Sequence, residues 1–223
     1  MPTRIYMVRH GATELTAEDR FAGSTDVPLS DEGRAQIAAL AERLRCDKLE
    51  AVYASPMIRT LETARIISKP HGLEPVPEPG FREIDYGCWE GRPRDELEAE
   101  HAEEYDAWQE DPLTVAPQGG ESGIQVLARA LPVLRRIVQN HRHSSVLLVS
   151  HKGTIRLLIS SLLGFDARGY RDRLEQNPGS LNILDFTSDV RARLRLFNDS
   201  SHYQDVPART YKQGLSRWWR APG

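Results

Sequence analysis

The sequence predicts an α/β fold, a doubly wound three-layer α/β/α sandwich around a mostly parallel sheet. Short, almost continuous apolar runs recur along the 223 residues, as expected of strands that are buried on both faces. Segments with apolar residues at helical spacing lie between these runs. Strands that alternate with helices over this length are typical of a sheet covered by helices on both sides.

Five runs of β-prone residues are expected to form the strands. The second run stops at Pro56, and the last two runs form a hairpin that turns at Ser188 and Asp189. The near-continuous apolar character of the first three indicates the parallel part of the sheet. The predicted strands are residues 5–8, 51–55, 145–150, 181–187 and 192–197.

Four segments are predicted to form helices. Ser30 is expected to cap the first, in which Ile37, Leu40 and Leu44 share one apolar face. Gly164 is expected to end the last. The other three helices are predicted at residues 59–68, 126–138 and 154–163.

We expect one domain over residues 1–223, because this length suits a single α/β core. Residues 78–123 break the alternation of strands and helices, and they contain four prolines and many acidic residues. We interpret this segment as a partly helical insert over the end of the sheet where ligands bind. Residues 203–223 are expected to form a basic, aromatic tail.

Composition narrows the classes of partner. A net charge of −3 provides no broad basic field, so no nucleic acid partner is expected. No apolar run reaches the roughly 18 residues of a membrane helix, and Arg9 interrupts the N-terminal run, so neither a membrane partner nor a secretory signal is expected. Two cysteines are too few for a disulfide framework. We therefore expect a cytoplasmic protein, and the sequence leaves monomer and homodimer open.

Two histidines and two arginines are predicted to meet at one edge of the sheet. Arg9 and His10 follow the first strand, and His151 follows the third. Arg59 lies in the first turn of the helix after the second strand. Ligands of such sheets bind at the carboxyl ends of the strands. Arginine can grip phosphate oxygens in a bidentate fork, and a neutral imidazole has a lone pair for nucleophilic attack, so these residues point to phosphoryl chemistry.

The surrounding residues resemble the histidine phosphatase (phosphoglycerate mutase-like) superfamily. Arg9-His10-Gly11 is similar to its signature, and Ser150-His151 to its last motif. The resemblance implies a phosphatase that acts on a small phosphorylated metabolite, with no metal site and no cofactor. The remaining matching segments, in order along most of the chain, are residues 12–14, 28–33, 54–64, 81–91 and 119–122.

The resemblance also implies roles for individual residues. His10 becomes phosphorylated, and water later hydrolyses the phosphohistidine. Arg9 and Arg59 bind the phosphate, and His151 donates a hydrogen bond to it. Glu83 matches the general acid that protonates the leaving oxygen.

Several positions are expected to border the acid or the substrate. Asp85 is the local alternative to Glu83 as the acid. Lys152 stands where a small residue is common in the family, and we expect it to contact a second anionic group of the substrate. Thr16 stands where many relatives carry asparagine. The complete set of expected substrate-binding residues is Thr16, Arg20, Gly23, Thr25 and Lys152.

Three alternatives were weighed against this interpretation. Cys88 and Arg94 have the spacing of cysteine phosphatases, but a tryptophan, a glutamate and a proline lie between them, where that chemistry needs backbone donors. A phosphoglycerate mutase is the more serious alternative. Residues 92–116, however, form a shorter and more acidic segment than the insert of cofactor-dependent mutases, which favours a phosphatase. A non-catalytic module that binds phosphoryl ligands would not require Glu83.

Overall fold

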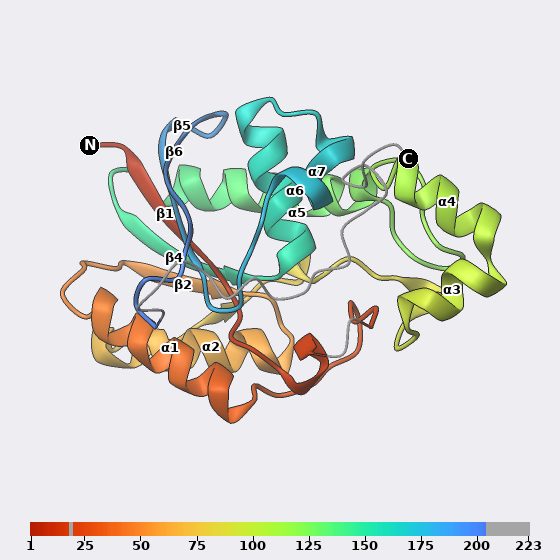
Figure 1. The fold of residues 1–223 in the computed structure, drawn as a ribbon. Coiled ribbons are helices and arrows are strands. Elements are labelled where there is room, and N and C mark those ends of the chain that lie inside the picture. Colours follow the sequence, from red (N-terminus) through yellow and green to blue (C-terminus); the bar gives the residue numbers. More distant parts are fainter. Residues whose placement is uncertain (18–19, 204–223) are drawn as a thin grey trace.

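The computed structural model describes residues 1–17 and 20–203, which form a six-stranded sheet between two layers of helices (Figure 1). The strand order is β3-β2-β4-β1-β5-β6. The first four strands are parallel, and β5 and β6 are antiparallel. The predicted α/β/α sandwich with a mostly parallel sheet is therefore confirmed. The strands are β1 Thr3–Arg9, β2 Ala51–Ala54, β3 Val76–Pro77, β4 Ser145–Ser150, β5 Leu181–Ser188 and β6 Arg191–Asp199.

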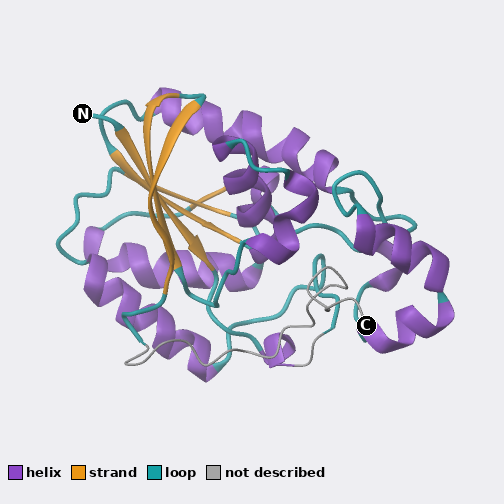
Figure 2. Cartoon of the chain, turned by 45° about the horizontal axis from the view of Figure 1, so that its top comes forward, coloured by secondary structure: helices purple, strands orange, loops and turns teal. Residues whose placement is uncertain are grey.

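Helices α1 and α2 cover one face of the sheet, and α5 and α6 cover the other (Figures 1 and 2). Strand β1 has apolar side chains on both faces of the sheet, because successive side chains of a strand point to opposite faces. Ile5 and Met7 belong to the core on one face, and Tyr6 and Val8 to the core on the other. No helix in the described residues is long and apolar enough to cross a membrane. The helices of the two layers are α1 Asp31–Leu44, α2 Ile58–Ser68, α5 Gly123–Asn140, α6 Lys152–Leu163 and the short α7 Tyr170–Arg173.

Local capping sets where the helices begin. Ser30 caps α1 as predicted, because its hydroxyl accepts a hydrogen bond from the Gly33 amide at 3.1 Å. Gly33 also lets the chain after β1 approach closely, since a Cβ there would lie 2.1 Å from the Ala12 carbonyl oxygen. Helix α5 begins three residues earlier than predicted, because Ser122 and Gln125 form a reciprocal capping box.

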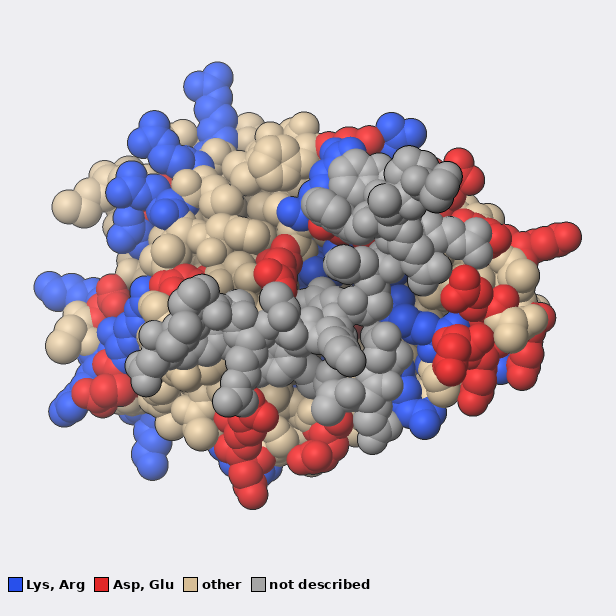
Figure 3. All heavy atoms as spheres, in the orientation of Figure 1, with Lys and Arg blue, Asp and Glu red and all other residues tan. Residues whose placement is uncertain are grey.

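The segment 78–123 carries two short helices, α3 Arg94–Glu100 and α4 Ala102–Glu110, set apart from the main layers (Figure 1). Their inner faces surround a small core of their own, and Phe21 from the loop after β1 completes it. Acidic side chains gather on the outside of these helices (Figure 3). The members of this core, called the aromatic cluster below, are Phe21, Trp89, Leu97, Tyr105 and Trp108.

Two details differ from the prediction. Strand β3, Val76–Pro77, was not predicted, because two exposed residues carry no strand pattern of their own and pair only with the end of β2. Strand β5 continues one residue beyond its predicted end, and β6 begins one residue before and ends two residues after its predicted run. The hairpin therefore turns at Asp189 and Val190, not at Ser188 and Asp189 as predicted, because Ser188 still pairs with Arg191. Residues 204–223, which hold most of the expected basic tail, lie outside the described residues.

Candidate active site

The sheet topology brings the two motif histidines together. In the parallel pair β1–β4, Arg9 lies opposite Ser150, so His10 and His151 follow at neighbouring strand ends. Their rings lie edge to face with centroids 5.2 Å apart. Strand β2 flanks β4 on its other side, and Ser55 follows it at the same edge. The site is thus at the carboxyl ends of three adjacent parallel strands.

The His10 ring is oriented and kept neutral by its surroundings. It is 6% exposed, and its Nδ1 lies 2.8 Å from the Gly11 carbonyl oxygen. A carbonyl can only accept, so Nδ1 carries the proton and Nε2 of the neutral ring keeps its lone pair. Burial, followed by the charges of Arg59 and Arg9, holds the pKa of His10 well below the usual histidine value. This arrangement suits a nucleophile.

Main-chain carbonyls anchor the two guanidinium groups beside His10. Arg59, which is 3% exposed, donates from Nη1 to the Thr25 carbonyl at 2.8 Å and from Nη2 to the Gly23 carbonyl at 3.0 Å. Arg9 donates from Nη1 to the Gln176 carbonyl at 2.6 Å. Burial lowers the pKa of Arg59, yet guanidinium stays charged at neutral pH. Two fixed cations therefore flank the imidazole.

Glu90 organises the loop that anchors Arg59. Its carboxylate accepts hydrogen bonds from the amides of Gly23, Ser24 and Thr25 at 3.0, 2.9 and 3.3 Å. It also accepts from the Thr25 hydroxyl at 2.9 Å. A side chain at position 23 would clash, since a Cβ there would lie 1.8 Å from the Ile84 carbonyl oxygen. Glu90 was not predicted as a site residue, because the loop amides that it binds are 65 to 67 residues away in the chain.

His151 is fully buried and held by Ser55. Its Nε2 lies 2.7 Å from the Ser55 hydroxyl, and its Nδ1 has no hydrogen-bond partner among the described residues. Burial, then the charges of Arg59 and of the neighbouring His10, keeps the pKa of His151 well below the usual value. A buried ring nitrogen without a partner is costly, and a bound oxyanion within reach would satisfy it.

Glu83 projects from the insert to the start of α6. Its carboxylate accepts from the Gly153 amide at 2.9 Å and from the Thr154 amide at 3.1 Å. The main chain of Glu83 is held by Arg129 on α5, which donates a hydrogen bond to the Glu83 carbonyl at 2.9 Å. Asp85, the alternative acid, instead accepts from the Gly87 amide at 2.8 Å and is not among the residues that line the cavity described next.

A cavity of about 140 Å³ opens beside His10. The predicted residues Lys152 and Arg20 line this cavity. Gly23 and Thr25 do not line it, and their carbonyls instead accept hydrogen bonds from Arg59. The side chain of Thr16 lies outside the described part of the chain. Two lining residues of the insert, Tyr86 and Arg94, were not among the predicted site residues. The lining residues are Arg9, His10, Thr13, Leu15, Arg20, Phe21, Ala22, Val27, Arg59, Glu83, Tyr86, Arg94 and Lys152.

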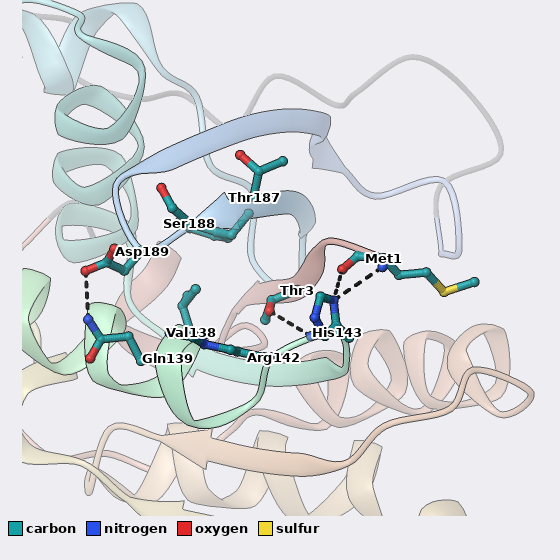
Figure 4. A pocket seen from close by; sticks show the side chains of 10 residues that line it. Met1, Thr3, Val138, Gln139, Arg142, His143, Thr187, Ser188 and Asp189 are labelled. Atoms are coloured by element: carbon teal, nitrogen blue, oxygen red, sulfur yellow. Dashed lines mark hydrogen bonds between the residues drawn. The ribbon is translucent and has the colours of Figure 1, made fainter.

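Two other places in the molecule do not share this chemistry. A larger cavity of about 320 Å³ lies at the opposite end of β1, between Thr3, His143 and Asp189 (Figure 4), and it contains none of the motif residues. Cys88 is exposed in a short 3-10 turn and is not one of the residues that line the catalytic cavity. The described residues also contain no group of three or more His, Cys, Asp or Glu side chains suited to a metal ion.

The comparisons with known proteins agree with this geometry. The chain belongs to the histidine phosphatase superfamily, since the family model described as "Histidine phosphatase superfamily (branch 1)" matches residues 5–200. Its enzyme class is therefore that of the phosphatases of this family.

Named relatives differ in the substrate that their names state. Phosphoserine phosphatase 1 of Hydrogenobacter thermophilus is 34% identical, over 73% of this chain and 77% of that protein. A probable phosphoglycerate mutase GpmB of Cronobacter sakazakii is 33% identical, over 82% of this chain and 85% of that protein. The Bifunctional protein Rv2228c of Mycobacterium tuberculosis is 34% identical over 90% of this chain, which spans only 55% of that longer protein.

Solved structures show the same fold. YhfR of Bacillus stearothermophilus superposes with a TM-score of 0.84 at 30% identity and covers 91% of this chain and 100% of its own. The mycobacterial glucosyl-3-phosphoglycerate phosphatase Rv2419c, solved with VO3, superposes with a TM-score of 0.79 at 30% identity and covers 87% of this chain and 98% of its own.

Proposed function

We propose that this chain hydrolyses a small phosphomonoester without a metal ion, through a phosphohistidine at Nε2 of His10. The observation that carries the proposal is the state of the His10 ring, which is buried, neutral and bound through Nδ1 to the Gly11 carbonyl. Only Nε2 then has a lone pair to attack phosphorus. Phosphoryl transfer needs little more than positioning and neutralisation of charge, which fits a site built from arginines and imidazoles.

In the first step Nε2 of His10 attacks phosphorus, and the bond from phosphorus to the ester oxygen breaks. Arg9 and Arg59 neutralise the non-bridging oxygens, for which their fixed guanidinium groups are suited. Donation by the Ser55 hydroxyl to Nε2 of His151 leaves a proton on Nδ1, which can then donate to the same phosphate. The carboxyl group of Glu83, which lines the cavity, gives its proton to the departing alkoxide.

In the second step water attacks the phosphohistidine, and the bond between phosphorus and Nε2 breaks, returning the electron pair to His10. The Glu83 carboxylate accepts the proton that the water loses, which restores the starting state. Atoms and charges balance over the two steps without a further reactant. A phosphoglycerate mutase would share the first step but return the phosphoryl group to an alcohol.

Trapping the intermediate tests the proposal. Wild-type protein mixed with a ³²P-labelled phosphomonoester and quenched in base should carry acid-labile, base-stable label on His10. The His10→Ala variant should lose at least about 10⁴-fold in kcat, as expected when a nucleophile is removed. The matched control is His71→Ala, which changes an imidazole in the turn after α2. Full turnover by His10→Ala would contradict the mechanism.

The same assay separates the alternatives. With 3-phosphoglycerate, free phosphate in excess of 2-phosphoglycerate supports the hydrolase, and the reverse supports the mutase that the GpmB relatives are named for. If the protein bound phosphomonoesters tightly but hydrolysed or isomerised none of them, that result would support a binding module. Activity that survives a chelator in excess supports metal independence.

A further inference from the structure

The start of helix α6 binds the carboxylate of Glu83. The N-cap residue of this helix, His151, makes no capping hydrogen bond with its own side chain, and the first amides of a helix have no partner within it. Glu83 supplies that partner from the insert, since its Oε2 accepts from the Gly153 amide at 2.9 Å and its Oε1 from the Thr154 amide at 3.1 Å. The helix dipole also favours a carboxylate at this end. The acid of the proposed reaction is therefore fixed to the helix that follows His151.

These contacts make the two carboxylate oxygens of Glu83 unequal. Oε1 also accepts from the Ile84 amide at 3.0 Å, and the Thr154 hydroxyl lies 3.3 Å from it. Among the described residues, Oε2 accepts from the Gly153 amide alone. A carboxylate oxygen has two lone pairs, so both pairs of Oε1 are occupied, whereas Oε2 keeps one that can hold a proton.

Gly153 leaves room for the carboxylate of Glu83. A Cβ at position 153 would lie 2.8 Å from Oε1 of Glu83. Gly153 is an ordinary residue of helix α6 without a positive φ, so its backbone does not require glycine. The absence of a side chain at this position is therefore explained by the close approach of Glu83.

Two further side chains hold the main chain around Glu83. The hydroxyl of Thr154, which is fully buried, donates to the Arg82 carbonyl at 2.7 Å. Arg129 on α5 donates to the carbonyls of Arg82 and Glu83, both at 2.9 Å. Its guanidinium group also forms a bidentate ion pair with Glu121, with both hydrogen bonds at 2.8 Å, and such a fork has a fixed geometry. The carbonyls before and after the Glu83 side chain are thus held from two helices.

We propose that Gly153, Thr154 and Arg129 are positioning residues for the general acid, and that they hold Glu83 so that Oε2 gives the proton to the departing ester oxygen. As the bond from phosphorus to that oxygen breaks, the proton passes from Oε2 to the alkoxide, and the amides of Gly153 and Thr154 stabilise the carboxylate that remains. A displacement of about 1 Å can cost on the order of 10²-fold in rate, so the placement of this carboxylate matters. The inference rests on the proposed phosphatase function and deepens it.

A pair of aryl esters tests this positioning in the full chain. The leaving group of phenyl phosphate needs a proton, whereas the phenolate of 2,4-dinitrophenyl phosphate leaves without one. Because kcat/KM covers only the steps up to the breaking of the ester bond, the later role of Glu83 as a base does not enter. Gly153→Ala displaces the carboxylate without removing a donor, so kcat/KM should fall by about tenfold to 100-fold for phenyl phosphate and by less than about threefold for the dinitrophenyl ester. The control is Ser161→Ala, at an exposed position of the same helix.

Conservative variants test the other two residues. Thr154→Val removes the hydroxyl at nearly constant volume and should lose about tenfold on phenyl phosphate alone, whereas Thr154→Ser should stay within about threefold of wild type on both esters. Arg129→Lys keeps the charge opposite Glu121 but loses the fork, so it should also lose about tenfold on phenyl phosphate alone. Its control is Arg136→Lys, at a second arginine of α5 that is paired with a glutamate. Thermal melts accompany the kinetics, and Gly153→Ala should not lower Tm, because alanine favours a helix over glycine.

The outcomes separate positioning from a purely structural role. Equal losses on the two esters would mean that these residues only support the fold, and no loss on either would mean that Glu83 does not need them, so both results overturn the inference. In a Glu83→Gln background, Gly153→Ala should cost little more on phenyl phosphate, and a full further loss would contradict the inference as well. Failure to hydrolyse any phosphomonoester would refute the phosphatase and this inference with it, whereas equal losses in an active enzyme refute the inference alone.

Discussion

The two sides of the catalytic cavity hold their cations by different means. On the side of the sheet, Arg9 and Arg59 are anchored by main-chain carbonyls around a histidine at a strand end. On the side of the insert, Arg94 rests on an aromatic ring and Lys152 lies among arginines. The first arrangement fixes one geometry, which suits the phosphate of the proposed reaction. The second holds its cations by ring stacking and by packing beside other charged side chains.

The largest expected effect belongs to the side of the sheet. Arg59→Lys keeps the charge but loses the fork that two carbonyls hold, so kcat should fall by about 10²–10³-fold. The loss should be the same for substrates with and without a second anion, because Arg59 acts on the phosphate in the proposed reaction. Steady-state kinetics measure the loss with 3-phosphoglycerate, which carries a second anion, and with glycerol 3-phosphate, which does not. Arg65→Lys on the exposed face of α2 is the control, and a loss of less than about tenfold would show that the fork is dispensable.

A smaller effect is expected from Glu90, which positions Arg59 through the loop of residues 23–25. Glu90→Gln replaces one acceptor oxygen by a donor facing backbone amides, so kcat should fall by about 10–100-fold. The exposed Glu103→Gln is the matched control on α4. If Glu90 acts through Arg59, the double variant with Arg59→Lys should lose little beyond Arg59→Lys alone. Additive losses would mean that Glu90 affects the site by another route.

The smallest expected effect concerns pH. An imidazole of ordinary pKa would lose about half of its nucleophilic form at pH 6.5 and about nine-tenths one unit lower. The pKa of His10 lies well below that value, so its neutral form persists as the pH falls through 6.5. We expect kcat/KM to change by less than about twofold between pH 7.5 and pH 6.0.

The measurement uses an aryl phosphate whose second phosphate pKa lies below the scanned range and whose leaving group needs no proton. The substrate then does not change its charge over the scanned range, and the attack by His10 needs no proton from Glu83. A fall with a midpoint near pH 6.5 would show that His10 is not shielded. The Lys152→Met variant, which alters the other side of the cavity, should give the same profile.

Much of the side of the sheet could be predicted because its information is local. His10 and His151 each follow an apolar strand, and Arg59 lies in the first turn of the helix after a third strand. Parallel strands place their carboxyl ends at one edge of a sheet, so these residues were expected at that edge. That β4 lies between β1 and β2, which makes the two histidines neighbours, was decided by the sheet topology. The cap at Ser30 was equally local, since its partner is three residues away.

The side of the insert could not be predicted in this way. The prolines and acidic residues of segment 78–123 predicted a break in the alternation of strands and helices, but neither its helices nor its aromatic cluster follow from a period in the sequence. Phe21 reaches that cluster from the loop after β1, and Arg171 reaches Trp108 from α7. Such contacts depend on how separate loops pack, for which a single sequence carries no pattern.

The sequence by itself determined the sandwich, the strand ends and the motif residues that follow them, because these depend on short-range periodicity and on the geometry of parallel strands. Only the tertiary structure decided which partners orient those residues. Glu90 reaches the loop of residues 23–25, Ser55 meets His151, and Arg94 and Lys152 come to face one cavity. The physical reason is that side-chain hydrogen bonds and ring stacking join residues far apart in the chain, and packing alone sets their distances.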